Sequence, residues 1–155
     1  MFVFDKDCII LNATVASPKE VILLLAGFLA KKGLVSDKFG MAAFEREQSF
    51  PTGVPASPFS FAFPHADGTK VYQSSLAVAT LAQPLLFHSM EDPRVELKVR
   101  AVFLTASRTP KDQVNVLKRF SSFFKKEGNL LTLSQFTDPA GLAAWMQEQI
   151  ISKIR

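Results

Sequence analysis

The amino-acid sequence predicts a single α/β domain over residues 1–155, in which helices cover both faces of a mixed β-sheet in α/β/α layers. Three observations lead to this prediction. The chain of 155 residues is long enough to build one sizeable core. Segments of strand type alternate with capped helices along its whole length. Several connections are too short for the crossovers of a purely parallel sheet, which favours a mixed one.

The N-terminal part of the chain predicts a short strand followed by a helix. The apolar run Cys8–Leu11 is typical of a strand. The segment Ser17-Pro18-x-Glu20 is a capping box with proline at the first helical position, and apolar residues with helical spacing follow it. Gly33 is expected to end this helix.

A second helix, a loop and a strand are expected next. The helix spans about 37–48, with Met41 and Phe44 among its inward-facing residues. Residues 51–58 contain three prolines and a glycine, which predicts a rigid loop without regular structure. The segment Phe59-Ser60-Phe61-Ala62-Phe63 alternates as a strand does.

The second half of the chain predicts two longer strands and two helices. Val71–Ala82 is an apolar stretch typical of a strand covered on both faces. Val95–Thr105 begins with alternation and ends fully apolar, which indicates a strand that enters the core. Thr109-Pro110-x-Asp112 begins a capped helix that ends before Gly128. Asp138 and Pro139 begin the last helix.

The composition excludes several classes of function. The net charge of +4 comes from Lys and Arg residues spread thinly in pairs, so no nucleic-acid-binding face is expected. Glycine-rich nucleotide motifs are absent, and two histidines with one cysteine do not predict a metal site. No apolar run approaches the about 20 residues of a membrane span, and no signal-peptide pattern is present.

Two residue types carry further information. Fifteen phenylalanines against one tyrosine and one tryptophan predict a core rich in aromatic rings. The single cysteine, Cys8, excludes an internal disulfide, which agrees with a cytoplasmic location. No histidine is near Cys8 in the sequence, so it is interpreted as a small, partly buried residue rather than a nucleophile.

The two histidines differ in their surroundings. His88 follows Pro84 in a polar connection and is interpreted as an exposed loop residue. His65 follows Pro64 directly, at the end of the strand predicted over 59–63. Because Pro64 lacks an N–H and restricts the residue before it, the strand must stop there. The imidazole of His65 is therefore expected at the sheet edge, where a nucleophile could meet a partner protein.

The residues around His65 form a longer pattern. Arg46-Glu47-x-x-x-Pro51-Thr52-Gly53, an alternating strand and then Ala62-Phe63-Pro64-His65 resemble enzyme IIA proteins of the fructose–mannitol type. These are components of the bacterial phosphoenolpyruvate-dependent sugar phosphotransferase system. The resemblance covers most of the chain. It implies that the protein accepts phosphate from the phosphocarrier HPr and passes it to an enzyme IIB, and through this to the membrane component IIC, without a cofactor.

The resemblance assigns roles to two residues. His65 matches the phosphorylated histidine, and Arg46 matches the active-site arginine, whose guanidinium can offer two parallel N–H bonds to phosphoryl oxygens. A surface charge paired with Glu45 or Glu47 is the other interpretation of Arg46. Thr52 could form a hydrogen bond near the phosphoryl group or stabilise its own loop.

Gln113 is expected at the position where many members carry a second histidine. It shares a helical stripe with apolar residues, so it faces inward and needs a hydrogen-bonded partner; the stripe contains Gln113, Val116, Leu117, Phe120 and Phe124. A glutamine at this position is similar to galactitol-type members. Phe61 and Phe63 depart from the aliphatic residues usual before the phosphorylated histidine.

The resemblance further implies that the ε nitrogen of His65 is phosphorylated. Its δ nitrogen must then be held by an acceptor, for which a backbone carbonyl and Asp67 are candidates. Two other functions remain open. One is a regulatory protein of the same fold, whose phosphorylation state controls a partner, and the other is an interaction domain without phosphoryl transfer.

Overall fold

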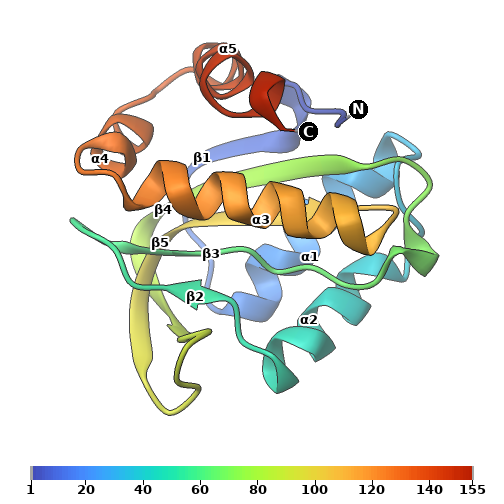
Figure 1. Ribbon diagram of the computed structural model, residues 1–155, viewed down its shortest axis with the longest axis horizontal. Coiled ribbons are helices and arrows are strands. Elements are labelled where there is room, and N and C mark those ends of the chain that lie inside the picture. The colour runs from blue at the N-terminus through green and yellow to red at the C-terminus, as the bar shows by residue number, and fades with distance from the viewer. Residues whose placement is uncertain (1, 155) are drawn as a thin grey trace.

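The computed structural model describes residues 2–154, which form one α/β domain around a five-stranded sheet (Figure 1). The strand order is β1-β4-β5-β3-β2. The pairs β1–β4 and β3–β5 are parallel, whereas β4–β5 and β2–β3 are antiparallel, which confirms the predicted mixed sheet. The strands are β1 (Ile9–Ala13), β2 (Gly53–Val54), β3 (Ser60–Ala62), β4 (Ser75–His88) and β5 (Glu96–Ala106).

Helices cover both faces of the sheet, as predicted (Figure 1). On one face lie α1 (Pro18–Lys31) and α2 (Phe39–Ser49). On the other lie α3 (Pro110–Lys125), α4 (Asn129–Ser134) and α5 (Pro139–Gln149). Three short 3-10 helices complete the described elements, namely η1 (Lys6–Cys8), η2 (Gly68–Lys70) and η3 (Ile151–Lys153). The sequence predicted each of the longer helices but not α4.

The capping signals explain where the longer helices begin. The Ser17 hydroxyl accepts a hydrogen bond from the N–H of Glu20 at 3.2 Å, and the Glu20 carboxylate accepts one from the N–H of Ala16 at 2.7 Å. Thr109 caps α3 in the same way through the N–H of Asp112, at 3.1 Å. These contacts satisfy N–H groups that lack partners inside the helix.

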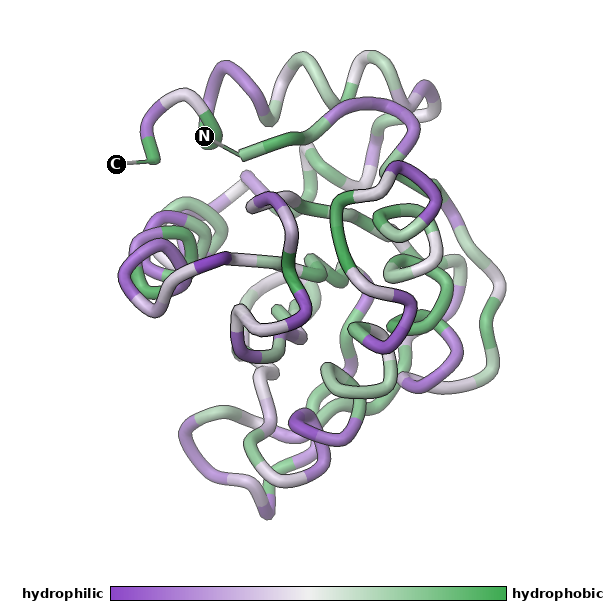
Figure 2. The backbone as a smooth tube through the Cα atoms, turned by 90° about the vertical axis from the view of Figure 1, so that its right-hand side faces the viewer, coloured by the Kyte–Doolittle hydropathy of each residue, from purple (hydrophilic) through white to green (hydrophobic). Residues whose placement is uncertain are grey.

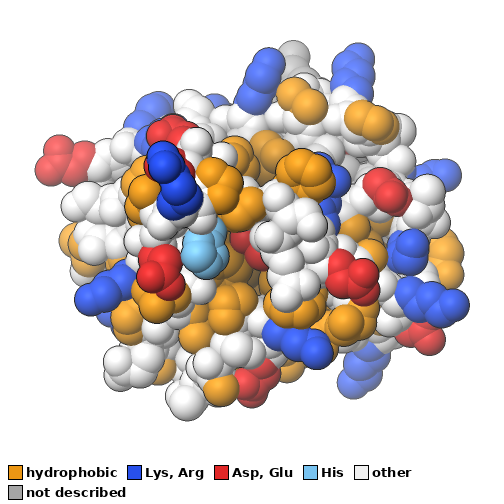
Figure 3. Space-filling model, turned by 90° about the horizontal axis from the view of Figure 1, so that it is seen from below, with side chains coloured by type: hydrophobic (Ala, Val, Ile, Leu, Met, Phe, Trp, Pro, Cys, Tyr) orange, Lys and Arg blue, Asp and Glu red, His pale blue; other side chains and the backbone are white. Residues whose placement is uncertain are grey.

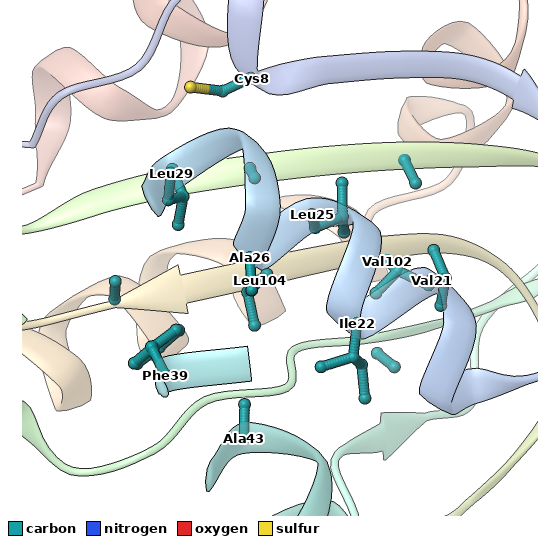
Figure 4. Packing of buried hydrophobic residues seen from close by; sticks show 14 of the residues in the cluster. Cys8, Val21, Ile22, Leu25, Ala26, Leu29, Phe39, Ala43, Val102 and Leu104 are labelled. Atoms are coloured by element: carbon teal, nitrogen blue, oxygen red, sulfur yellow. The ribbon is translucent and has the colours of Figure 1, made fainter. Parts of the chain in front are cut away.

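The first core lies between the sheet and α1 with α2. Figure 4 shows the apolar face of α1 directed at β5 and at α2. The residues labelled there include Val21, Ile22, Leu25, Ala26 and Leu29 of α1, Phe39 and Ala43 of α2, and Val102 and Leu104 of β5. The helices approach closely because Gly40 has no side chain; a Cβ there would lie 2.9 Å from that of Ala26. The expectation that Met41 faces inward is wrong, since this side chain is 40% exposed and α2 buries Phe39, Gly40, Ala43 and Glu47 instead.

The second core lies between the sheet and α3, α4 and α5, and aromatic rings dominate it. The Phe103 ring stacks on that of Phe124 at 4.8 Å between centroids and meets that of Phe120 edge-on at 5.1 Å. Phe61 and Phe63, whose rings lie 5.2 Å apart, extend this cluster toward the end of β3. Many of the phenylalanines therefore pack in the core, as predicted.

The longest strand differs from its predicted limits of Val71 and Ala82. It begins at Ser75 and continues through Pro84 to His88. The pairing register between β4 and β5 shifts between Thr80 and Leu85, and a proline is tolerated at such an irregularity because no regular hydrogen bond is lost. His88 is exposed, as expected, but it ends a strand rather than lying in a loop.

The predicted loop and the termini also contain regular contacts. Residues 51–58 include β2, a short strand that was not predicted and that pairs with β3. α5 packs against η1 and β1, so the two ends of the described chain lie side by side (Figures 1 and 2). In Figure 2 the hydrophilic segments lie mainly in the outer turns. None of the helices within residues 2–154 has the length and apolar character needed to cross a membrane.

Cys8 is fully buried in the first core (Figure 4). Burial raises the pKa of its thiol to about 11, and the nearby carboxylate of Asp5 acts in the same direction. At neutral pH the thiol therefore stays protonated and is a poor nucleophile, which agrees with its interpretation as a structural residue.

Candidate functional site

A cavity of about 330 Å³ opens where β3 and β5 end and α3 begins. The two strands are parallel, so their carboxyl ends meet at the same edge of the sheet, which is where α/β proteins commonly form binding sites. His65, Arg46 and Gln113, three of the four predicted site residues, line this cavity together. The full lining consists of Arg46, His65–Gly68, Ser107, Thr109, Pro110, Gln113, Val114 and Leu117.

His65 lies one step beyond β3, held by the neighbouring strand. It forms an isolated parallel bridge with Thr105 of β5, whose N–H donates to the carbonyl of Pro64 at 3.1 Å. Side chains alternate between faces along a strand, so His65 follows Phe61 and Phe63 on the α3 side of the sheet. The ring is half-buried, which leaves part of it open to the cavity.

The backbone carbonyl of Phe63 holds the δ nitrogen of His65. The two atoms are 2.8 Å apart, and since a carbonyl oxygen only accepts, Nδ1 carries the hydrogen and Nε2 keeps its lone pair. Of the two expected acceptors, the backbone carbonyl is confirmed and Asp67 is wrong. The Asp67 carboxylate instead accepts from the N–H of Thr69 at 2.9 Å and caps η2.

The surroundings of His65 favour its neutral form. Burial lowers the pKa of the imidazole, because a charged ring loses hydration there. The hydrogen bond to Phe63 acts in the opposite direction, and the positive charge of Arg46 lowers the pKa further. The ring is therefore mostly uncharged at neutral pH, which is the state in which Nε2 can act as a nucleophile.

Arg46 reaches the cavity from the last turn of α2. Its guanidinium lies over the Phe50 ring, 5.0 Å from the ring centroid, which fixes its position without neutralising it. Within residues 2–154 it forms no ion pair with Glu45, Glu47 or any other carboxylate, so the alternative of a paired surface charge is wrong. The guanidinium is available for an anion in the cavity.

Thr52 lies in a buried hydrogen-bond network behind His65. Its hydroxyl donates to one carboxylate oxygen of Glu47 at 2.7 Å, and its N–H donates to the other at 2.9 Å. The same hydroxyl accepts from the N–H of Phe63 at 3.1 Å. Phe63 is thus held through its N–H by Thr52, while its carbonyl holds His65. This geometry fits the loop-stabilising role of Thr52.

Glu47 is 8% exposed and was not predicted as a site residue. Burial raises the pKa of its carboxyl to about 7, although both hydrogen bonds from Thr52 oppose this shift. The network therefore contains a titratable group that changes charge near neutral pH. In the sequence Glu47 directly follows Arg46, and this was the one feature that could have marked it. The sequence does not show that Arg46 lines the cavity while Glu47 turns inward to Thr52.

Gln113 contacts the strand end through Thr105. Its Nε2 donates to the Thr105 hydroxyl at 2.9 Å, which confirms that this inward-facing amide has a hydrogen-bonded partner. Its Oε1 is buried and has no partner among the described residues. Thr105 and Ser107 were missed by the sequence analysis. The signal was their alternation with Phe103 at the end of β5, which places all three on the α3 side of the sheet.

Comparisons with known proteins agree with this geometry. The family model described as "Phosphoenolpyruvate-dependent sugar phosphotransferase system, EIIA 2" matches residues 2–149. The galactitol-specific EIIA component of Escherichia coli K12 is 24% identical over 99 residues, which cover 64% of this chain and 65% of that protein. The 2-O-α-mannosyl-D-glycerate-specific EIIABC component of the same organism is 32% identical over 90 residues, which cover 57% of this chain and 13% of that protein.

Solved structures share the fold over nearly the whole chain. A PTS IIA protein from Streptococcus mutans has a TM-score of 0.77 at 20% identity and covers 97% of this chain and 93% of its own. The mannitol enzyme IIA of Escherichia coli, in complex with phosphorylated enzyme IIB, has a TM-score of 0.76 at 21% identity. The match covers 94% of this chain and 99% of that one. The nitrogen regulatory protein IIA-Ntr of Neisseria meningitidis gives 0.70 at 18% identity, with 90% and 92% covered.

The family match extends over almost all described elements, from the residues before β1 to the end of α5. EIIA components of this system are phosphotransferases that act through a phosphohistidine. The aligned region reaches less than two thirds of the length of the curated relatives, so it is the family, rather than any one relative's substrate, that the comparisons assign. This chain belongs to the EIIA type 2 family of the phosphoenolpyruvate-dependent sugar phosphotransferase system.

Proposed function

We propose that this protein relays a phosphoryl group, which Nε2 of His65 accepts from phospho-HPr and passes to an enzyme IIB in the cytoplasm. One observation carries the proposal. The carbonyl of Phe63 holds Nδ1 at 2.8 Å, so the free lone pair belongs to Nε2 in a cavity that Arg46 also lines. A neutral nucleophile beside a cation suits an incoming phosphoryl group, which is negatively charged.

The transfer needs little covalent chemistry from the protein. The bond between nitrogen and phosphorus in the donor breaks as the Nε2–phosphorus bond forms, and the donor imidazole keeps the electron pair. The Nδ1–H of His65 keeps its hydrogen and its bond to the Phe63 carbonyl. Charge in the transition state spreads over three equatorial oxygens, where the Arg46 guanidinium can donate two parallel hydrogen bonds.

Gln113 adds a second polar group on the α3 side of the cavity. A rotation of its amide by 180° keeps the contact with Thr105, because that hydroxyl can donate as well as accept. Nε2 of Gln113 would then occupy the place of the unpartnered Oε1 and donate to a phosphoryl oxygen. An amide in this position provides a hydrogen bond without a titratable proton.

The proposed transport substrate is galactitol or a related sugar. Its support is the sequence similarity to galactitol-specific EIIA and the glutamine at position 113. A regulatory role is the second candidate, since the fold also matches the nitrogen regulatory protein IIA-Ntr. In both roles His65 carries phosphate, but only the first restores sugar uptake.

Labelling by phospho-HPr tests the relay. The purified chain is incubated with enzyme I, HPr and radiolabelled phosphoenolpyruvate, and we expect an acid-labile, base-stable adduct on His65. His65→Ala should abolish it, whereas His88→Ala should not. His88 is a matched control, because its Nδ1 also contacts a backbone carbonyl, that of Pro93 at 2.7 Å, outside the cavity. An unlabelled wild-type chain would reject phosphoryl transfer.

Reconstitution separates transport from regulation. Membranes that contain galactitol-specific IIB and IIC components are supplied with enzyme I, HPr and this chain. Restored uptake of galactitol, lost in His65→Ala, supports the transport role. Labelling of His65 without phosphate transfer to IIB, and without uptake, would favour the regulator.

A further inference from the structure

Ser107 is one of the residues that line the cavity, immediately after β5 and two residues before Thr109, which caps α3. Along the end of β5, Phe103 packs in the α3-side core and Thr105 contacts Gln113. Alternation places Ser107 on this same side. Since His65 pairs with Thr105, Ser107 lies one residue pair beyond that bridge, at the carboxyl end of β5.

The backbone around Ser107 is fixed against the turn that follows His65. A Cβ atom at Gly68 would lie 3.0 Å from the carbonyl oxygen of Ser107 and would collide with that of Arg108. Only glycine allows this approach. Ser107 is therefore held by packed backbone in the lining of the cavity that also contains His65, rather than placed on a free loop.

The Ser107 hydroxyl is buried. The residue is 2% exposed, and its Oγ has no hydrogen bond within the described part of the chain. The ordinary task of a serine before a helix, capping its first N–H groups, is already performed by Thr109 through Asp112. A buried hydroxyl without a partner costs free energy, so its presence in a lined cavity indicates a ligand that supplies the acceptor.

We propose that the Ser107 hydroxyl donates a hydrogen bond to the phosphoryl group carried by His65. This inference rests on the proposed function, because His65 must carry that group. The phosphoryl oxygens are acceptors only, which matches a hydroxyl that has no acceptor among residues 2–154 of the unphosphorylated protein. Arg46 and Ser107 then contact the group from α2 and from the end of β5.

The hydrogen bond exists only after phosphoryl transfer, so it stabilises the phosphorylated form and not the free form. Removing this hydrogen bond is therefore expected to change the equilibrium constant of phosphoryl transfer as well as its rate. Ser107→Ala should shift the equilibrium with phospho-HPr toward HPr by about tenfold, the effect of one hydrogen bond to a charged group. Because the hydroxyl has no partner among the residues that the structure describes, the same substitution should leave the melting temperature unchanged or raise it.

Ser75→Ala is the matched control. The Ser75 hydroxyl is likewise buried without a described partner, but Ser75 pairs with Ala106, whose side chain lies in the core on the α1 side of the sheet. We expect this variant to keep the wild-type transfer equilibrium. The ³¹P resonance of phosphorylated His65 should move in Ser107→Ala and stay in place in Ser75→Ala.

The outcomes separate this inference from the proposed function. If wild type is labelled on His65 and Ser107→Ala has the same equilibrium and ³¹P resonance, the role of Ser107 is overturned and the relay stands. If wild type takes no label from phospho-HPr or from phosphoramidate, a small-molecule donor, both fail. A titration of His65→Ala with inorganic phosphate tests whether the ligand of the Ser107 hydroxyl is instead a free anion. Saturable binding that requires Ser107 would assign the hydroxyl to that anion and reject our proposal.

Discussion

The δ nitrogen of His65 lies 2.8 Å from the carbonyl oxygen of Phe63, two residues earlier in the chain. Phe63 is itself held by the hydroxyl of Thr52, which contacts the buried carboxyl of Glu47. The tautomer of the imidazole is therefore set by a backbone position that the loop after α2 fixes.

The imidazole of His65 should titrate below 6.5, the ordinary pKa of histidine. Burial is the main cause, and the positive charge of Arg46 adds to it. Phosphorylation of the free protein should thus persist as the pH falls to 6.5 and decline only below it. Titration of the ring resonances by NMR measures this pKa. It should rise in Arg46→Ala, and a value above 6.5 in wild type would contradict the proposed surroundings.

Arg46→Ala should slow phosphorylation of His65 by about 100-fold, the usual effect of losing one donor to a developing charge. Arg46→Lys should recover part of the rate, because an ammonium keeps the charge but not the two parallel hydrogen bonds. Quenched-flow labelling with phospho-HPr measures the rate. Arg94→Ala is the control, since that side chain is 90% exposed and pairs locally with Asp92 at 3.1 Å. Equal rates in the two alanine variants would remove Arg46 from the site.

Gln113→Leu should slow phosphorylation by about tenfold and leave a measurable reaction, because Arg46 remains. The variant also deprives the Thr105 hydroxyl of its donor, so the free energy of unfolding should fall by about 1 kcal/mol. Labelling rates and urea unfolding measure the two effects. Gln147→Leu, on the exposed side of α5, should change neither the rate nor the stability by a comparable amount. A wild-type rate in Gln113→Leu would assign Gln113 to structure alone.

The carboxyl of Glu47 should make stability depend on pH. Its folded-state pKa of about 7 lies above the ordinary value of 4.5, so the folded protein binds this proton more tightly than the unfolded chain does. The stabilisation is fully present below about 4.5 and is lost as the pH rises through about 7. At about 1.4 kcal/mol per pH unit, the difference between these two pKa values corresponds to roughly 3 kcal/mol of folding free energy.

Glu47→Gln tests this dependence, because an amide of the same shape does not titrate. We expect urea unfolding of wild type to show lower stability at pH 8 than at pH 5.5, and the variant to show a smaller difference. Glu45→Gln, an exposed neighbour on α2, should retain the wild-type dependence. If the Glu45 and Glu47 variants have the same pH profile, the buried carboxyl is not the titrating group.

Much of the fold follows from local signals in the sequence. The caps at Ser17 and Thr109 and the alternation before Pro64 predict elements that the structure confirms, because capping and strand patterning act within a few residues. The errors have tertiary causes. β4 passes through Pro84 because the pairing with β5 shifts there, and α2 buries Gly40 and exposes Met41 because α1 packs closely against it.

The sequence also does not predict which exposed residues border the cavity. In Figure 3 hydrophobic side chains reach the surface among both basic and acidic ones, as is normal for a folded protein. Among the exposed apolar residues is Val114, which lines the cavity. The sequence periodicity of α3 marks its buried side but does not show that Val114 borders the cavity of His65.

The sequence by itself determined the α/β class, the ring-rich core and the histidine that follows Pro64, since each depends on composition or on neighbours along the chain. Only the tertiary structure decided that Phe63 rather than Asp67 holds the imidazole, that Thr52 turns inward to Glu47, and that Ser107 lines the cavity with no hydrogen-bond partner among residues 2–154. Hydrogen-bond partners depend on distances between segments far apart in the chain. Those distances are set when two helical layers close on one sheet.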